Sequence, residues 1–230
     1  MSLRREEFSV DEWYHCYTRG VEKKKIFETV GDYRRYVQLL YLCNSTQVIH
    51  RSDIFKRVDD IFSMFRPDTL VDIGAYCLMP NHPHLLIKEK RPGGISKFMQ
   101  KLGTAYTMYF NIKNNRTGSL FITPFRSKHV KNDAYLQRVV QYIHLNPAEL
   151  KEFGWKRGSV KNMGALETFL EQYPYSSLAE HQEKNRPQKT IIAQEIFNLI
   201  HPMKFPLMLA EAREYYEEIA REDPIVKATP

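Results

Sequence analysis

Apolar residues in the middle of the chain form two short runs separated by a turn signal. Residues 71–78 and 82–88 are rich in apolar side chains, and a Pro-Asn pair lies between them. This pattern predicts two antiparallel strands joined as a hairpin. Residues 13–18 mix aromatic and polar side chains and predict another strand, and residues 119–130 are expected to be extended.

Helical spacing is clearest after the predicted hairpin. Ile95, Phe98, Met99 and Leu102 fall at i, i+3, i+4 and i+7 of a segment that continues to Lys113. A side chain at each of these positions lies on one face of a helix. The spacing therefore predicts a long amphipathic helix directly after the hairpin.

Three further helices are predicted, two of them with a capping residue. Asp32 is expected to cap a helix running to about Cys43, and Asn132 is expected to cap a helix that Pro147 ends. Residues 53–65 carry apolar residues on one face and are expected to form the third.

The order of these elements predicts an α+β fold. Strands and helices alternate with hairpin-like pairs, which is typical of an antiparallel sheet with helices packed on it. After a polar stretch the character changes, and residues 191–200 and 206–221 predict two short helices. We therefore divide the chain into a main domain, residues 1–182, and a helical C-terminal extension, residues 183–230, to which the sequence assigns no role.

Composition favours a polyanionic partner. The chain has 230 residues, a formal net charge of +7, 14 Tyr and 13 Phe, so cationic side chains are available for phosphates and rings for bases. A basic enzyme unrelated to nucleic acid remains the alternative. The three cysteines lie far apart with no CxxC pair, which argues against a disulfide framework and a thiolate zinc site. No stretch approaches the roughly 18 apolar residues of a membrane span, so we expect a cytoplasmic protein without a membrane partner.

His82 and His84 lie one residue apart in the predicted strand 82–88. Strand side chains alternate, so both imidazoles point to one face, where neutral imidazoles suit a divalent metal. Pro83 donates no backbone hydrogen bond, which predicts an edge strand or an irregularity there. The alternative is that the two histidines are unrelated polar residues near a turn.

The helix before Pro147 carries a second candidate pair. Tyr135, Tyr142 and Asn146 form a stripe to one side of its apolar face, and Tyr142 and Asn146 are one turn apart. A tyrosine nucleophile one turn before an amide ligand would form a working unit, since a metal held by the amide oxygen can polarise the phosphate that the phenol attacks. The alternative is that Tyr142 packs and Asn146 ends the helix.

Basic residues precede this helix. Phosphate binding is one interpretation of these side chains, and solvated surface is the other. The four are Arg116, Arg126, Lys128 and Lys131. Three more histidines are present, of which His144 faces away from the Tyr142 stripe and is excluded from the site; the other two are His15 and His129.

Several of these pieces together resemble the single-tyrosine HUH transposases, most closely the REP-associated tyrosine transposase group. The resemblance covers roughly residues 10–180, and the order and spacing of its pieces are specific. The pieces are Leu78-Met79-Pro80-Asn81-His82-Pro83-His84-Leu85-Leu86, Gly118-Ser119-Leu120-Phe121, Phe125-Arg126-Ser127-Lys128, Tyr142-Ile143-His144-Leu145-Asn146-Pro147 and Tyr173-Pro174-Tyr175-Ser176-Ser177.

The resemblance implies a ferredoxin-like or RRM-like sheet bearing the histidine pair, with the nucleophile on a following helix. His82 and His84 match the metal-binding pair, Asn146 the third ligand and Tyr142 the nucleophile. It further implies Mg²⁺ or Mn²⁺ as Lewis acid and a single-stranded or hairpin DNA substrate, cut through a 5′-phosphotyrosine link that frees a 3′-OH. Relatives act as monomers or homodimers, so both states stay open.

The chain departs from this family pattern at two prolines. Pro83 replaces the usual bulky apolar residue between the histidines, and Pro124 stands where many relatives have a basic residue. The main hypothesis is thus a metal-dependent, single-tyrosine DNA endonuclease and strand transferase. Two alternatives remain: a non-catalytic nucleic-acid-binding protein on the same fold, and a metal-dependent phosphodiesterase that uses activated water.

Overall fold

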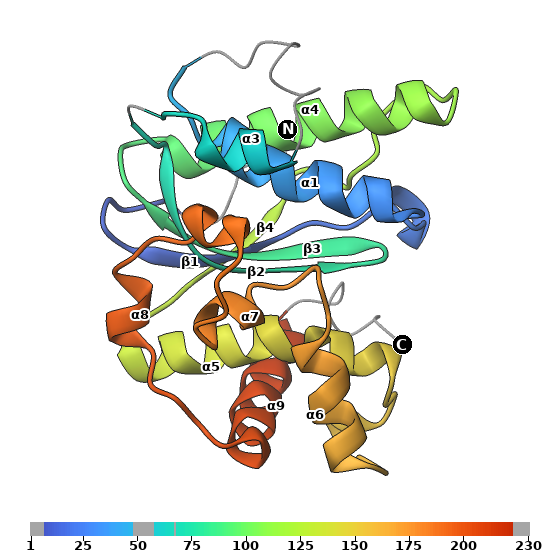
Figure 1. The fold of residues 1–230 in the computed structure, drawn as a ribbon, viewed down its shortest axis with the longest axis vertical. Helices are drawn as coiled ribbons and strands as arrows, with labels where there is room; N and C mark the ends of the chain where they lie inside the picture. The colour runs from blue at the N-terminus through green and yellow to red at the C-terminus, as the bar shows by residue number, and fades with distance from the viewer. Residues whose placement is uncertain (1–6, 48–57, 67, 223–230) are drawn as a thin grey trace.

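A four-stranded antiparallel sheet lies at the centre of the described structure (Figure 1). The computed structural model describes residues 7–47, 58–66 and 68–222. The strand order is β2-β3-β1-β4, and every neighbouring pair is antiparallel. The strands are β1 (Trp13–Tyr17), β2 (Val71–Met79), β3 (His82–Glu89) and β4 (Arg126–His129).

Helices cover both faces of the sheet (Figure 1). On one side lie α1 (Val30–Cys43), α3 (Val58–Ser63) and α4 (Gly94–Lys113). On the other lie α5 (Asp133–Leu145), α6 (Met163–Glu171), α7 (Leu178–His181), α8 (Ile196–Leu199) and α9 (Phe205–Glu222). Short 3-10 turns occupy Val21–Lys23, Asn146–Leu150, Trp155–Arg157 and Pro187–Ile191.

The chain follows a β-α-β-β-α-β path through β1, α1, β2, β3, α4 and β4. With the two connecting helices on one face, this is the ferredoxin-like arrangement, so the predicted α+β class is confirmed. The hairpin of β2 and β3 and the helices α4 and α5 also lie where the sequence predicts them. Of the predicted helix 53–65, residues 53–57 lie outside the described residues and α3 accounts for most of the remainder.

Pro83 lies at a local irregularity, one of the two expected alternatives, although β3 as a whole is not an edge strand. Strand β3 runs between β2 and β1, but its pairing with β1 begins only at His84, so at Pro83 only β2 lies alongside. Opposite Pro83, the backbone N–H of Leu78 donates to the Tyr175 carbonyl at 2.9 Å, and its carbonyl accepts from the Tyr173 hydroxyl at 2.6 Å. The missing N–H of Pro83 therefore leaves no group of Leu78 unsatisfied.

Asp32 caps α1 as predicted, although from inside the helix and not from the N-cap position. Thr29 is the N-cap of α1, and Asp32 is the third helical residue, whose carboxylate accepts from the backbone N–H groups of Glu28 and Thr29. The same carboxylate meets Lys113 Nζ at 2.7 Å and the Tyr109 hydroxyl at 2.9 Å on α4. Burial alone would raise the pKa of Asp32, but Lys113 and the backbone donors outweigh it and hold the pKa below its usual value.

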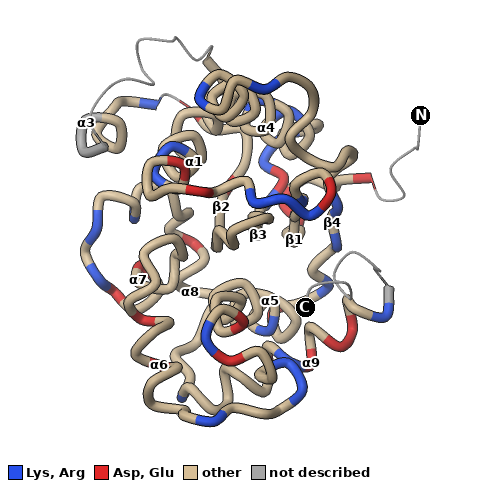
Figure 2. Tube along the Cα trace, turned by 90° about the vertical axis from the view of Figure 1, so that its right-hand side faces the viewer, with Lys and Arg blue, Asp and Glu red and all other residues tan. Residues whose placement is uncertain are grey.

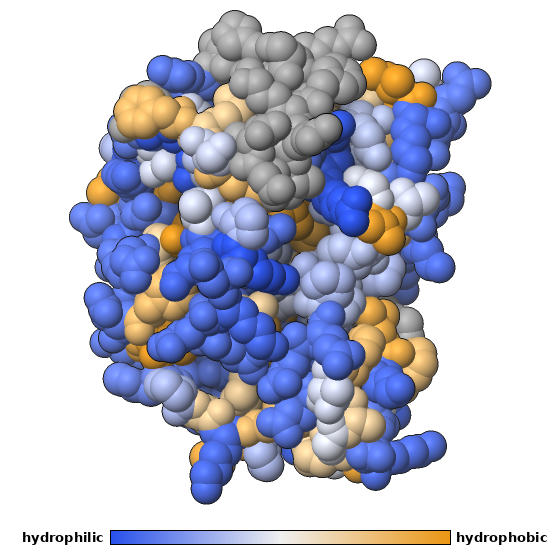
Figure 3. Space-filling model, in the orientation of Figure 1, coloured by the Kyte–Doolittle hydropathy of each residue, from blue (hydrophilic) through white to orange (hydrophobic). Residues whose placement is uncertain are grey.

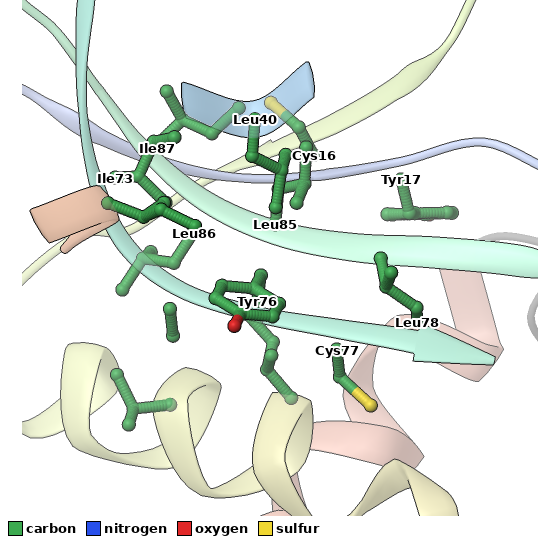
Figure 4. Packing of buried hydrophobic residues seen from close by; sticks show 14 of the residues in the cluster. Cys16, Tyr17, Leu40, Ile73, Tyr76, Cys77, Leu78, Leu85, Leu86 and Ile87 are labelled. Atoms are coloured by element: carbon green, nitrogen blue, oxygen red, sulfur yellow. The ribbon is translucent and has the colours of Figure 1, made fainter. Parts of the chain in front are cut away.

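The two faces of the sheet differ in chemistry. Leu85 pairs with Cys16, and both lie beside Leu40 of α1 in an apolar layer (Figure 4). Because successive residues alternate, His84 and Tyr17 are paired on the opposite face, toward α5. The alternation therefore places apolar residues under α1 and α4, and the histidines under α5.

Helix α9 lies against α5, the helix that carries Tyr142 (Figure 1). Arg138 of α5 pairs with Glu211 at 2.9 Å, and Lys128 of β4 pairs with Glu218 at 2.9 Å. These ion pairs fix α9 beside both elements. The division at residue 182 stays a prediction.

The outer surface is mainly hydrophilic in the orientation of Figure 1, with apolar residues scattered over it (Figure 3). Within the ranges that the structure describes, every helix is too short or too polar to cross a membrane.

Candidate active site and metal centre

His82 and His84 point to the α5 face of the sheet from the start of β3, where the hairpin turn ends. Their ring centroids are 4.7 Å apart and the rings meet edge to face. Both side chains are nearly buried, with exposed fractions of 6% and 2%. Two imidazoles are thereby held together beneath α5.

Asn81 fixes the orientation of the first imidazole. Its amide nitrogen donates to the Lys23 carbonyl at 3.3 Å, so the amide oxygen faces His82. That oxygen only accepts, and His82 Nδ1 lies 2.5 Å from it and is therefore the donor. The lone pair of His82 is consequently on Nε2, the nitrogen left for a ligand.

Tyr142 and Asn146 reach the same region from the end of α5. The Tyr142 ring centroid is 5.5 Å from that of His84, and Tyr142 is 1% exposed. Asn146 follows directly after α5, and its Nδ2 donates to the Tyr142 carbonyl at 2.8 Å. The amide thus has part of the helix-ending role that the alternative interpretation assigned to it, while its Oδ1 stays available.

Two buried polar atoms here lack a hydrogen-bond partner among the described residues: His84 Nε2 and Asn146 Oδ1. Such atoms are uncommon in folded proteins and indicate a ligand or a strained site. An imidazole nitrogen and an amide oxygen are both donors that divalent cations accept. No group of three His, Cys, Asp or Glu side chains in the described ranges is arranged to hold a metal. Two imidazoles and one amide are the donors here that could hold a divalent cation.

Burial sets the protonation of these groups. It holds the pKa values of His82 and His84 well below the usual value, an effect that the nearby cations Arg19 and Lys156 strengthen. Both imidazoles are neutral at pH 7 and keep a lone pair for a cation.

The Tyr142 phenol is also held in its neutral form. Burial raises its pKa, and the carboxylate of Glu149 adds to the rise. The Asn146 amide lies close enough to lower the pKa in part, because an N–H donor favours the charged phenolate. A phenol in this setting needs a positive partner before it can act as a nucleophile.

The sequence reasoning missed two buried cations beside the site. Arg19 is 4% exposed and lies just after β1, close enough to act on the pKa values of His82 and Tyr142. Lys156 pairs with Glu149 at 2.6 Å. The position of Arg19 at the end of a predicted strand was a usable signal, whereas Lys156 stands in a loop with no local signal.

The four predicted phosphate-binding residues do not form one cluster. Arg126 and Lys128 lie on β4 opposite Tyr17 and His15, on the histidine face of the sheet. Lys128 is already paired with Glu218. Arg116 lies beyond the far end of α4, where it bonds to Asn111 at 2.6 Å and to the Ser119 carbonyl, and Lys131 is exposed beyond β4. Basic residues also appear on α4 and on segment 23–25. Figure 2 shows that positive charge is spread over the helices on both faces of the sheet.

His144 lies apart from the His82–His84 pair, as its position on the helix predicts. Its Nε2 is 2.9 Å from Ser177 Oγ, which also accepts from the backbone N–H of Tyr76 at 2.9 Å. Ser177 ends the Tyr-Pro-Tyr-Ser-Ser stretch, so this part of the resemblance joins α5 to β2 and has a structural role here.

The comparison with known families covers all four candidate side chains. The family model described as "Transposase IS200 like" matches residues 32–146, half of the chain, a range that includes His82, His84, Tyr142 and Asn146. This chain belongs to the IS200-like transposase family. Its functional class is therefore DNA transposition, with DNA binding and recombination.

A solved structure of a REP-associated tyrosine transposase bound to a REP hairpin is also similar, with 13% identity over 82% of this chain and 90% of that chain and a TM-score of 0.49. At this level of similarity it adds nothing to the family membership. No curated protein matches the sequence. His15, Arg19, Lys156 and Tyr215 lie outside the matched range of the IS200-like family.

Proposed function

We propose that this IS200-like family member cleaves and rejoins single-stranded DNA next to hairpins, with Tyr142 as the nucleophile. The observation that carries the proposal is the meeting of His82, His84, Tyr142 and Asn146 on one buried face, where His84 Nε2 and Asn146 Oδ1 lack partners among the described residues. Two histidines on a solvated surface would be neither buried together nor short of hydrogen-bond partners.

In the proposed reaction, Tyr142 Oη attacks the phosphorus of a DNA phosphodiester. The new bond joins Tyr142 to the 5′-phosphate, the bond from phosphorus to the 3′ oxygen breaks, the phenol gives up its proton and the 3′ oxygen takes one up. The freed 3′-OH can later attack the phosphotyrosine and reverse the step. His82, His84 and Asn146 would hold Mg²⁺ or Mn²⁺, which when bound supplies Lewis-acid polarisation of the phosphate.

Other residues of this chain prepare that step. Arg19, a buried cation beside both His82 and Tyr142, is placed to balance the charge of a phosphate entering the site. Tyr142 is 1% exposed, with the rings of Tyr215 and Tyr216 at 5.1 and 6.4 Å between centroids, so part of its surroundings must rearrange before a phosphodiester reaches the phenol.

A denaturing gel tests the proposal. The full chain is incubated with Mn²⁺ and single-stranded hairpin DNA labelled at either end. A 5′-phosphotyrosine keeps the segment on the 3′ side of the cut, so we expect a 3′ label in the covalent adduct and a 5′ label on the released strand. Tyr142→Phe is expected to give no adduct. Tyr135→Phe is the matched control, since it removes a hydroxyl of the same helix that bonds to Glu218 at 3.1 Å.

Two outcomes would contradict the proposal. Cleavage without an adduct, unchanged in Tyr142→Phe, would assign the chain to the phosphodiesterases that use activated water. Tight hairpin binding without cleavage, in both Mg²⁺ and Mn²⁺ and across a library of flanking sequences, would assign it to the nucleic-acid-binding proteins.

A further inference from the structure

His15 lies between the candidate metal site and the C-terminal helix. Its side chain is fully buried in β1, on the same face of the sheet as His84. His15 Nε2 is 2.9 Å from His84 Nδ1, and His15 Nδ1 is 2.7 Å from the Tyr215 hydroxyl of α9. Tyr215 is fully buried and its ring also contacts that of Tyr142, 5.1 Å away between centroids. A continuous hydrogen-bonded chain therefore runs from α9 through β1 to β3.

The protons of these three hydrogen-bonded side chains can be arranged in two ways. If Tyr215 donates to His15, then His15 donates to His84 Nδ1, and the proton of neutral His84 lies on Nε2. That N–H would be buried without an acceptor, because Nε2 has no partner among the described residues. In the opposite arrangement His84 Nδ1–H donates to His15, His15 donates to the Tyr215 oxygen, and Nε2 carries a lone pair. The hydroxyl hydrogen of Tyr215 then has no acceptor among the described residues, so each arrangement leaves one hydrogen unpaired. What separates them is the cation, because only a bare Nε2 can bind it.

The second arrangement makes His84 equivalent to His82. The amide oxygen of Asn81 already requires the proton of His82 to lie on Nδ1, which leaves His82 Nε2 bare. Two imidazoles with bare Nε2 atoms side by side suit one cation, since the nitrogen that binds a metal is set by the hydrogen bond of the other nitrogen. Asn81 and His15 would then each accept the Nδ1–H of one histidine, Asn81 from His82 and His15 from His84.

We propose that His15 and Tyr215 are positioning residues that hold His84 with its proton on Nδ1 and its Nε2 lone pair directed at a divalent cation. The inference rests on the proposed function, in which His82 and His84 hold that cation. It assigns the C-terminal helix α9 a role at the metal centre, through the hydrogen bond between Tyr215 and His15. The ion pairs Arg138–Glu211 and Lys128–Glu218 hold α9 in the register that this contact needs.

Calorimetric titration of the full chain with Mn²⁺ tests the inference without using activity. His84→Ala is the reference and should abolish binding at the site. His15→Phe should weaken affinity about 10- to 100-fold, the usual effect of losing the hydrogen-bond partner of a metal ligand. His15→Gln should weaken it less, because its amide oxygen can accept from His84 Nδ1–H. Tyr215→Phe should weaken it by about 10-fold or less.

Tyr135→Phe is the matched control for Tyr215→Phe. Its ring packs against that of Tyr215 at the same α5–α9 contact, but its hydroxyl bonds to Glu218. We expect wild-type affinity for this variant. Thermal unfolding midpoints are measured alongside, because a purely structural role would move the midpoints of His15→Gln and Tyr215→Phe and leave the Mn²⁺ affinity of the folded protein unchanged.

A direct reading of the proton uses the wild-type protein and needs a variant only to assign the signal. Long-range ¹H–¹⁵N spectra of the Mg²⁺-loaded chain, with the His84 signal assigned by its loss in His84→Ala, should show the His84 proton on Nδ1. A proton on Nε2, or wild-type Mn²⁺ affinity in both His15→Phe and Tyr215→Phe, would overturn the inference and leave the proposed function standing. If the wild-type chain binds no Mn²⁺, the metal site of the proposed function fails, and the inference fails with it.

Discussion

The two faces of the central sheet differ in what they bury: one buries mainly apolar side chains and the other buries polar groups. The face under α1 and α4 is mainly apolar, and its buried carboxylates are satisfied: Asp32 by the backbone, Lys113 and Tyr109, and Glu89 by the first N–H groups of α4. The face under α5 and α9 buries imidazoles, phenols and an amide, and within the described ranges it leaves polar atoms of His84 and Asn146 without partners. Burial stabilises the first face, whereas the second holds polar groups in place at a cost in free energy. A face built in this way indicates a site for a ligand.

The largest effect is expected from removing an imidazole on the α5 face. His84→Ala should reduce DNA cleavage about 1,000-fold or more, because a bound cation supplies several kcal/mol of transition-state stabilisation. The free energy of unfolding should change little by comparison. Single-turnover experiments measure the cleavage rate, and urea unfolding curves measure the free energy of unfolding. A variant that loses stability as strongly as it loses cleavage would contradict the proposed difference between the two faces.

The opposite face should show the reverse behaviour. Leu40→Ala removes a fully buried side chain beneath α1 and should lower the free energy of unfolding by about 2–5 kcal/mol. Mn²⁺ affinity of the folded protein should match the wild type, since Leu40 lies across the sheet from the histidines. A Leu40→Ala variant that is stable but binds Mn²⁺ more weakly would show that the two faces are coupled.

The buried histidines outside the proposed site predict a pH dependence of stability. Burial lowers the pKa of His181 to about 4, although its contact with the Gly74 carbonyl opposes the shift. The unfolded chain takes up a proton at this residue near pH 6.5 and the folded chain does not until about pH 4, so its contribution to stability is full above pH 6.5 and is lost as the pH falls toward 4.

This loss can be measured by urea unfolding at pH 7 and pH 5. His181→Gln keeps a donor for Gly74 and should reduce the fall in unfolding free energy between these values by about 2 kcal/mol at most. If the free energy of unfolding falls equally in the variant and in the wild type, groups other than His181 cause the pH dependence.

The smallest effect is expected at the link between α1 and α4. Asp32→Asn keeps the shape of the side chain but weakens its bonds to Lys113 and to the N-terminal N–H groups of α1. We expect a loss of about 1–2 kcal/mol in the free energy of unfolding, the usual range for a cap or a charged hydrogen bond. Guanidinium unfolding monitored by circular dichroism would measure it, and a more stable variant would contradict this account of α1.

The sequence predicts most of the fold because its elements depend on local patterns. The turn at Pro80-Asn81, the periodicity from Ile95 and the cap at Asn132 place β2, β3, α4 and α5 correctly. What the sequence leaves open concerns the surroundings of a residue. Pro83 predicts an edge strand or an irregularity. Strand β3 is central in the sheet, but β1 does not extend to Pro83, and Tyr173 and Tyr175 bond to the backbone of Leu78 opposite it.

The site is only partly predictable for the same reason. The i, i+4 spacing of Tyr142 and Asn146 and the strand alternation of His82 and His84 are visible in the sequence. Nothing local pairs His15 with Tyr215, 200 residues later, or Lys128 with Glu218. Such contacts depend on how α9 packs against α5, which no periodicity encodes.

The most direct test of the central claim is to identify the residue that carries DNA in the covalent adduct. The rings of Tyr215 and Tyr216 both lie within contact of the Tyr142 ring, so loss of the adduct in one variant is weaker evidence than a mapped bond. Peptide mass spectrometry after nuclease digestion should locate the phosphonucleotide on Tyr142. A modification on Tyr215 or Tyr216, or on no tyrosine while cleavage proceeds, would contradict the account.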